Sequence, residues 1–362
     1  MLYKQRSIPM AKKPLKKRKI IIIACIVVPA LIAAIVAGGI IAYEMIFGMR
    51  YRTEPWLAFT AADYDGLIME RSDFDSDGVT LAGYKYSREG MQPKGVVVIA
   101  HGLGSGGHNN FMPFIDIFTS NGYYVFSYDA HGNGESGGKS VEGLPQGLID
   151  LNKAICHAET IEEYAGLPFM LLGHSWGAYS SANALNLHPE MAAAVIISGF
   201  NETEDMLMYF GRQYIGPAAP LTMPILEMYE KMKFGAEYTD ITGVEGLANT
   251  DARIMIIHSA DDDTVPIDYG YDTYYEAFAD SERFEFVRYE DRGHGYLFYS
   301  DAAAAYRDEI NAGYTAYIEE NGLEYSAENK EAYMVNFDKK RAFEPDAELA
   351  AQIIAMFDEA CA

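Results

Sequence analysis

Cysteine is scarce in this sequence of 362 residues, which contains three. That number excludes a disulfide-stapled scaffold and any zinc module built on four cysteines. Proline and glycine, with 14 and 33 residues, are too few for a collagen-like or proline-rich polymer. Positive charge is also in short supply, because 28 Lys and Arg face 52 Asp and Glu, a formal net charge of −24. We therefore expect no nucleic acid partner, since phosphate backbones attract basic surfaces.

Apolar residues are abundant instead, at 49% of the chain against 22% charged residues. This composition excludes a disordered chain, and the length suits one large domain or two small ones. The sequence has no H-E-x-x-H motif of a metalloprotease. The segment 73–84 begins like a calcium-binding loop but ends in Tyr84, where a bidentate Glu is needed. We expect neither a metal ion nor a cofactor.

Charge is distributed unevenly along the chain. Residues 1–50 hold nine Lys and Arg and a single acid, whereas the remaining residues hold 19 and 51. The uncharged run Ile20–Tyr43 follows a basic cluster, and as a helix it would be about 36 Å long, against roughly 30 Å of bilayer hydrocarbon.

This pattern predicts a basic cytoplasmic tail at 1–19, a transmembrane helix at 20–47, a juxtamembrane stalk at 48–72 and an acidic body at 73–362. The excess of positive charge before the run puts the N-terminus inside the cell and the body outside the cell membrane. A cleaved signal peptide is the alternative, although its apolar core normally has about 7–15 residues, fewer than this run.

Short apolar runs alternate with helical patterns along the body. The runs are Val79–Ser87, Val96–Ala100, Tyr123–Tyr128, Phe169–Leu172, Ala194–Ile197, Ile254–Ile257 and Phe284–Tyr289. Such alternation predicts an α/β domain with a mostly parallel sheet and helices on both faces. The interval 201–251 has no convincing strand and is rich in Met and aromatic residues. We predict a helical cap there; ordinary core helices are the alternative.

The strongest motif is Gly173-His174-Ser175-Trp176-Gly177. It follows the apolar run Phe169–Leu172 and opens an alanine-rich stretch, which is the strand–turn–helix setting that G-x-S-x-G requires. A serine hydroxyl becomes a nucleophile when a base takes its proton. His294 is the candidate base, because it alone among the eight histidines has both the nucleophile and a strand-end acid upstream.

The acid that orients the imidazole is expected just beyond the run Ile254–Ile257, in the segment Asp261-Asp262-Asp263. The residues alone do not choose among these three aspartates. A tetrahedral intermediate also needs two backbone N–H donors. We predict those of Trp176, which follows the nucleophile, and of Leu103, in the glycine-rich loop after Val96–Ala100.

Together these segments resemble the α/β-hydrolase fold, specifically the serine hydrolases that include monoacylglycerol lipases, lysophospholipases and serine aminopeptidases. The resemblance runs from about Asp73 to about Phe298. The segments that carry it are Asp77-Gly78, Leu81–Tyr84, His101-Gly102, Asp129–Ser136, Gly173–Gly177, Asp262–Pro266 and Gly293-His294.

The resemblance implies that the acid stands three residues before the Val of a D-x-x-V-P segment, which is Asp262, with Asp263 as the second choice. It also implies a cap where 201–251 falls. Three further residues are implied to be scaffold: Asp129, His131 and Ser136. Two features depart from the family: the bulky Trp176, whose indole is expected to narrow the pocket, and the long acidic segment 300–343.

We therefore expect a membrane-anchored serine hydrolase whose Ser175, His294 and Asp262 cleave carboxylic esters, without a cofactor. The Met-rich cap and the anchor favour acylglycerols or related lipid esters as substrates. A peptidase of the same fold and a catalytically silent, membrane-tethered binding domain are the alternatives. The sequence leaves the oligomeric state open.

Overall fold

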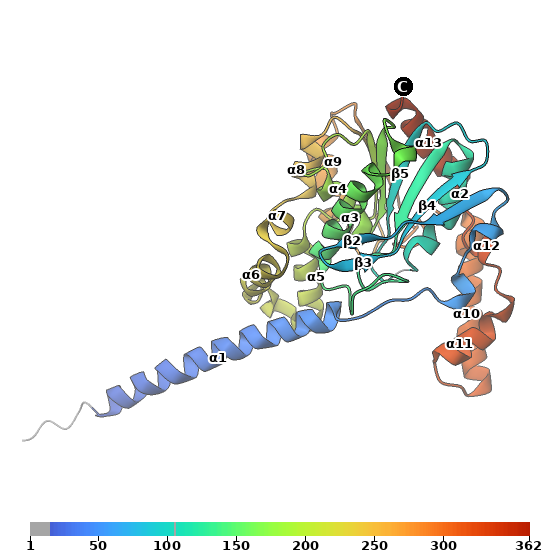
Figure 1. Ribbon diagram of the computed structural model, residues 1–362. Coiled ribbons are helices and arrows are strands. Elements are labelled where there is room, and N and C mark those ends of the chain that lie inside the picture. Colours follow the sequence, from blue (N-terminus) through green and yellow to red (C-terminus); the bar gives the residue numbers. More distant parts are fainter. Residues whose placement is uncertain (1–14, 105) are drawn as a thin grey trace, which may run out of the picture.

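A computed structural model of the protein describes residues 15–104 and 106–362 (Figure 1). Within these residues the centre is a sheet of eight strands in the order β1-β4-β6-β5-β7-β8-β9-β10. Its strands are β1 (Leu67–Arg71), β4 (Gly83–Arg88), β5 (Gly95–Ala100), β6 (Tyr123–Tyr128), β7 (Phe169–His174), β8 (Ala193–Ile197), β9 (Arg253–Ser259) and β10 (Phe284–Tyr289). Strands β5 to β10 run parallel, whereas β4 pairs antiparallel with β1 and β6. The predicted mostly parallel sheet is confirmed.

The central strands are buried on both faces because their sequences are continuous apolar runs. All six residues of β5 are buried, and successive side chains of a strand point to opposite faces. Val96 and Val98 accordingly join the core on one face, and Val97 and Ile99 join the core on the other.

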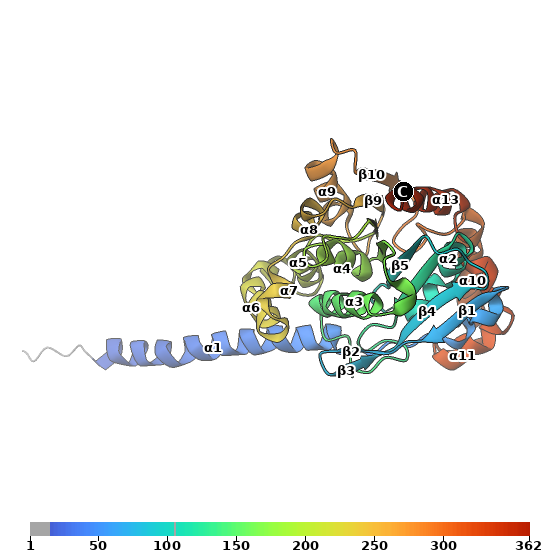
Figure 2. The same cartoon turned by 45° about the horizontal axis from the view of Figure 1, so that its top comes forward.

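Helices cover both faces of this sheet (Figure 2). Helices α3 (Leu144–Glu159), α4 (Trp176–Ala184) and α9 (Tyr271–Phe278) contribute to the first core, and α2 (Met112–Ser120) and α13 (Ala347–Ala360) contribute to the second. This layered arrangement is the α/β-hydrolase architecture expected from the sequence.

The alternating run Val79–Ser87 forms two strands, not the single strand that its pattern predicts. Its first part, β3 (Val79–Leu81), pairs with β2 (Phe74–Ser76) in a separate hairpin, and its second part is β4. The division falls at Ala82, whose N–H donates to Ser136 Oγ at 2.7 Å. The chain therefore leaves the hairpin for the main sheet at this residue.

The interval 201–251 contains helices and no strand among the described residues. The helices are α5 (Thr203–Ile215), α6 (Met223–Phe234), α7 (Ala236–Thr239) and α8 (Gly243–Asn249), and they lie between β8 and β9 in the chain. Met206 and Leu207 of α5 are buried, but Met228 and Met232 of α6 are 64% and 81% exposed. Part of the apolar surface of this helical insertion therefore faces outward.

Helix α1 (Leu15–Phe47) projects from the domain (Figure 1) and includes the whole of the predicted membrane segment 20–47. Residues Cys25–Phe47 are long and apolar enough to cross a membrane, a property that a signal sequence shares. The predicted tail at 1–19 lies outside the described residues as far as position 14. The last turns of α1 pack into the domain, where Tyr43 and Phe47 are 2% and 1% exposed.

Polar contacts attach the end of α1 to α6. The Tyr43 hydroxyl donates to one oxygen of Glu230 at 2.7 Å, and Thr203 donates to the other oxygen at 2.7 Å. Glu44 pairs with Lys233 at 2.8 Å. Burial raises the pKa of Glu230 to about 7, although the two hydroxyl donors oppose this rise. Helix α1 is thus anchored to the cap region by buried contacts.

The segment 48–72 lies along the domain instead of forming the expected stalk. The Arg50 guanidinium donates to carbonyl groups of the loop that follows β6, including Gly138 at 2.7 Å and Gly134 at 3.0 Å. Leu67–Arg71 is the edge strand β1 of the main sheet. The domain therefore begins before residue 73, because these residues find backbone partners on it.

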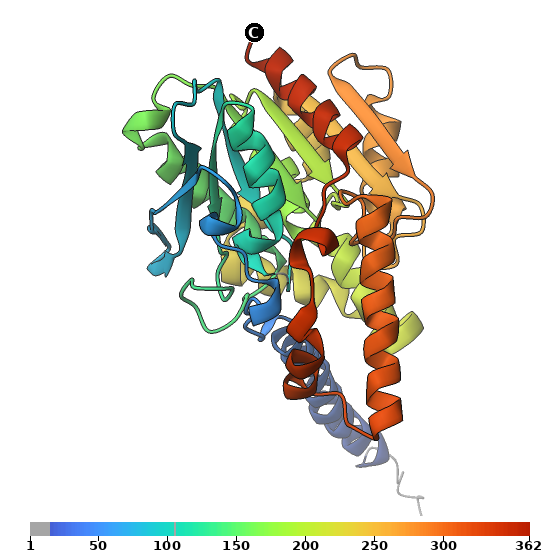
Figure 3. The ribbon, with the colours of Figure 1, turned by 90° about the vertical axis from the view of Figure 1, so that its right-hand side faces the viewer.

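The segment 300–343 forms a helical projection on the same end of the molecule as α1 (Figure 3). Its helices are α10 (Asp301–Asn321), α11 (Ala327–Tyr333) and α12 (Lys339–Ala342). Tyr306 and Ala342 are buried against the domain core, whereas much of α11 is exposed.

Candidate active site

Ser175 lies at a strained turn between β7 and α4. Its backbone has φ 57° and ψ −119°, a conformation that residues other than glycine adopt at a cost of about 1–3 kcal/mol. A Cβ on Gly173 would lie 2.2 Å from the Gly177 carbonyl oxygen, and one on Gly177 would lie 2.1 Å from the Ala100 carbonyl oxygen. Both flanking glycines are therefore required, and the turn presents the hydroxyl at the carboxyl edge of the sheet.

His294 and Asp262 lie within hydrogen-bond distance of one another and of this serine. Ser175 Oγ is 2.9 Å from His294 Nε2, and His294 Nδ1 is 2.7 Å from Asp262 Oδ2. The structure thus brings together three residues that 119 and 32 positions separate in the sequence. An imidazole protonated at Nδ1 donates to the carboxylate and leaves the Nε2 lone pair to accept the serine hydroxyl.

Asp262 is held by a dense set of donors. Its Oδ1 accepts from the N–H groups of Thr264 and Val265, at 3.0 and 2.9 Å, and its Oδ2 also lies 3.2 Å from His258 Nε2. Burial opposes its ionisation, but hydrogen bonds from His258 and His294 hold the pKa of this carboxyl well below its usual range. Asp262 is therefore a buried carboxylate directed at the imidazole.

The neighbouring aspartates have different positions. Asp263 is exposed, and its side chain accepts from the Thr264 hydroxyl at 3.3 Å. Asp261 Oδ1 accepts from the N–H of Gly293 at 2.8 Å and from the Ser259 hydroxyl at 2.6 Å. Asp261 therefore fastens the loop that carries His294, a role that the aspartate run alone did not indicate.

Two further histidines that the sequence analysis left out pack around this centre. His174 is buried, its Nε2 donates to the His294 carbonyl at 3.0 Å, and the two rings are 4.9 Å apart. Burial and the charge of His294 lower the pKa of His174 to about 3, so it is neutral. His258 sits at the end of β9 and donates to the Val265 carbonyl and Asp262. The signal in the sequence that could have identified these two histidines is their position at the ends of predicted strands.

The two predicted oxyanion donors belong to segments close to Ser175. A Cβ on Gly102 would lie 3.3 Å from Ser175 Cβ, so the loop that carries Leu103 comes close to the serine. Trp176 is the first residue of α4, where an N–H has no acceptor within the helix. Its indole does not narrow the pocket as expected: it is buried and donates to the Leu144 carbonyl at 2.7 Å. The role of the two N–H groups stays a prediction.

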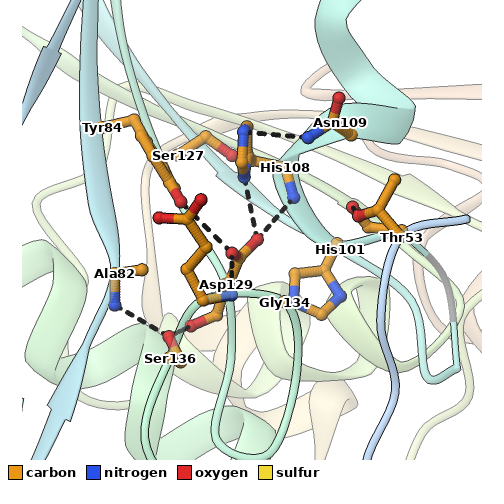
Figure 4. A network of polar contacts seen from close by, with 12 residues as sticks. Thr53, Ala82, Tyr84, His101, His108, Asn109, Ser127, Asp129, Gly134 and Ser136 are labelled. Atoms are coloured by element: carbon orange, nitrogen blue, oxygen red, sulfur yellow. Dashed lines mark hydrogen bonds and ion pairs between the residues drawn. The ribbon is translucent and has the colours of Figure 1, made fainter. Parts of the chain in front are cut away.

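Asp129 connects the segment after β5, which carries His108, with the loop after β6, which carries Glu135 (Figure 4). Its carboxylate accepts from the N–H and the Nδ1 of His108, at 3.1 and 2.8 Å, and from the N–H of Glu135 at 2.9 Å. His101 Nε2 accepts from the N–H of Ala130 at 2.8 Å. Burial opposes the ionisation of Asp129, yet the hydrogen bonds from His108 keep the pKa of this carboxyl below its usual range. This network fixes the glycine-rich loop relative to β6.

Carboxylate and imidazole side chains close enough to share a metal ion occur in the described part of the chain at Glu159, His188 and Glu190. These residues lie at the C-terminal ends of α3 and α4, away from Ser175 at the start of α4. His188 Nε2 is already engaged with Asn152 at 2.8 Å. This group is not part of the candidate site.

Comparison with known proteins shows which proteins the chain is similar to. A sequence model of the serine aminopeptidase family S33 matches residues 91–253, just under half of the chain. The uncharacterized protein YqkD of Bacillus subtilis is 25% identical over 250 residues, which cover 66% of this chain and 80% of that protein. A monoglyceride lipase homolog of monkeypox virus is 35% identical over 121 residues, 31% of this chain and 41% of the viral protein.

A solved esterase of Pyrococcus furiosus, Pf2001, has the same fold. Its TM-score is 0.51 at 18% identity, and the alignment covers 75% of this chain and 99% of the esterase. The chain has the α/β-hydrolase fold. Within that fold it resembles the group of serine aminopeptidases, esterases and monoglyceride lipases.

Proposed function

We propose that this chain is a membrane-anchored serine hydrolase that cleaves carboxylic esters through an acyl-enzyme. The observation that carries the proposal is the hydrogen-bonded series of Ser175, His294 and Asp262 at a strained strand–helix turn. A nucleophile, a base and an orienting acid in this geometry are the requirements for acyl transfer.

In the proposed mechanism, Ser175 Oγ attacks the acyl carbon while His294 Nε2 takes the hydroxyl proton. Asp262 keeps the proton of the neutral imidazole on Nδ1 and stabilises the imidazolium that forms. The N–H groups of Leu103 and Trp176 hold the oxyanion of the tetrahedral intermediate. His294 then gives its proton to the leaving alcohol, and water releases the acid by the reverse sequence.

A lipid ester is the proposed substrate class. A cavity of about 350 Å³ lies between α1 and the cap helices, with mostly apolar walls that include Ile35, Ala42, Ile46, Leu207, Phe210 and Leu226. Exposed apolar side chains also occur on the insertion 201–251, among them Leu221, Met228 and Met232. An acyl chain loses contact with water on such surfaces, which favours its binding at about 0.8 kcal/mol per buried CH₂ group.

The anchor is the second part of the proposal. Ile26 and Leu31 of α1 are 65% and 60% exposed, so the described protein does not cover them, and a bilayer would. The basic residues before the apolar run Ile20–Tyr43 favour an inward N-terminus and an outward domain. Extraction of membranes with alkaline carbonate would retain an anchored protein and release a protein whose N-terminal segment has been removed.

A panel of glycerol esters, short aryl esters and N-terminal peptide amides tests the reaction. We expect hydrolysis of the esters by the wild type and its loss in Ser175→Ala, with an unchanged melting temperature. Preferential cleavage of the peptide amides would favour a peptidase of the same fold. Ester hydrolysis that survives in Ser175→Ala would contradict the proposal.

A further inference from the structure

A second cavity, of about 460 Å³, adjoins the proposed active site. The immediate neighbours of the proposed reacting groups form one wall: Gly104, His174 and Gly295. The other walls come from the segment after α1 and from the C-terminal helices, through Arg52 and Arg307 among others. A substrate bound at Ser175 would therefore reach these two arginines.

Arg307 of α10 packs against three aromatic rings at this cavity. Its guanidinium carbon lies 4.8 Å from the centroid of Tyr296, 4.9 Å from that of Tyr299 and 5.0 Å from that of Phe343. Stacking on aromatic faces orients a guanidinium and leaves its N–H groups free to donate hydrogen bonds in the plane of the guanidinium.

The Nη1 of Arg307 is buried and has no hydrogen-bond partner within residues 15–104 and 106–362. Across the same residues, Arg307 makes no ion pair, whereas five other arginines of the domain do: Arg71, Arg88, Arg253, Arg288 and Arg292. Burial raises the pKa of the Tyr299 hydroxyl, and the charge of Arg307 and a hydrogen bond between the two side chains oppose that rise. Arg307 as a whole is half-buried and lines the cavity, so an anion there would pair with a guanidinium that has no carboxylate partner among the described residues.

The charge of this cavity contrasts with the rest of the domain. Arg52 is exposed and unpaired within the described chain, and the nearby Glu54 is balanced by Lys330 at 3.5 Å. Another cavity of about 510 Å³, within the insertion 201–251, is lined by one basic residue, Lys231, and by five acidic residues: Glu202, Glu204, Glu227, Glu230 and Asp240. An anion would be repelled there and attracted here.

We propose that Arg307, with Arg52, forms an anion subsite that binds a phosphate or carboxylate group of the ester substrate. The inference rests on the proposed function and adds to it a negatively charged group on the leaving alcohol or the acyl chain. A planar guanidinium can donate two parallel hydrogen bonds to either oxyanion. Arg307 is on helix α10 and Arg52 is in the segment that follows α1, so both arginines of the subsite lie outside residues 91–253, which match the family model.

The test compares three esters that share one acyl chain: those of glycerol, of glycerol 3-phosphate and of glycerate. For the wild type we expect kcat/KM to be at least about tenfold higher for one of the anionic esters than for the neutral ester. Arg307→Met should lower this ratio by about tenfold to one hundredfold, because charge-assisted hydrogen bonds are lost. Arg307→Lys, which keeps the positive charge but lacks the two parallel donors of a guanidinium, should give a ratio between those of the wild type and Arg307→Met. The phosphate and glycerate arms decide which oxyanion the subsite prefers.

Arg288→Met is the matched control, because it removes the same charge from an exposed arginine on β10 that pairs with Glu290. It should leave the ratio unchanged, and Arg52→Met, which disturbs no packed rings, should lower it. Calorimetry measures the affinity of the subsite independently of turnover. It compares the binding of glycerol 3-phosphate and of glycerate to Ser175→Ala protein with and without Arg307→Met.

Equal kcat/KM for the neutral and anionic esters in the wild type would overturn the subsite and leave ester hydrolysis standing. A ratio that Arg307→Met does not change would do the same. Failure to hydrolyse any of the three esters, together with Arg307-dependent binding of one of the two anions, would overturn the proposed reaction and retain the subsite.

Discussion

Replacement of Asp262 by asparagine tests the account of the site most sharply among single substitutions. Oδ2 of Asp262 faces two imidazoles, and Oδ1 faces two backbone N–H groups. An amide can offer an oxygen to one of these sides only. If its NH₂ faces His294, the imidazole carries its proton on Nε2 and cannot accept the Ser175 proton.

The expected magnitude follows from the loss of the correct tautomer. Removal of the orienting carboxylate in a serine–histidine–aspartate arrangement lowers kcat by roughly 10⁴-fold, which corresponds to about 5 kcal/mol in activation free energy. We expect Asp262→Asn to lower kcat for an aryl ester by about 10³–10⁴-fold. Initial rates and a thermal melt of the same preparation separate this effect from unfolding.

Asp263→Asn is the matched control in the same loop. Asp263 is exposed, and its carboxylate contacts the Thr264 hydroxyl, so we expect a change in kcat of about twofold or less. Retention of most activity in Asp262→Asn, with loss in Asp263→Asn, would refute the assignment of the acid.

Two further predictions concern the framework of the site and of the cap. Gly173→Ala should destabilise the domain by about 1–3 kcal/mol or abolish its folding, because the new Cβ would lie 2.2 Å from the Gly177 carbonyl oxygen; Gly295→Ala, with open space at its Cβ, should leave the melting temperature unchanged. Glu230 has a folded-state pKa of about 7, above its ordinary value of 4.5, so the wild type should lose stability as the pH rises between these values. Glu230→Gln, which mimics the protonated carboxyl, should be more stable than the wild type at pH 8 by up to about 3 kcal/mol and equal to it at pH 4; equal melting temperatures at both pH values would contradict this.

The central strands β5, β7, β8 and β9 could be predicted from the sequence because they are largely apolar runs, which suit burial on both faces of a parallel sheet. The order of Ser175, Asp262 and His294 was likewise readable, since each follows a strand and the carboxyl ends of parallel strands meet at one edge. The local pattern failed at Val79–Ser87, where contact between Ala82 and Ser136, which are 54 residues apart, divides the strand.

Other features depend on tertiary contacts that no local pattern contains. The Trp176 indole points into the core because the Leu144 carbonyl accepts its N–H, and the sequence offered no sign of this partner. Asp261 and His258 hold the loop and the carboxylate of the site from outside the recognised motif. The attachment of α1 to the cap through Tyr43 and Glu230 and the placement of Arg307 beside the site join segments more than one hundred residues apart.

Labelling with a fluorophosphonate probe tests the central claim directly, because the probe reacts with a serine only when a neighbouring base activates it. The account predicts one stoichiometric adduct on Ser175, located by peptide mass spectrometry of the folded full-length protein, and its loss in His294→Ala. Folded protein that forms no adduct at Ser175, as a silent binding domain would, contradicts the account.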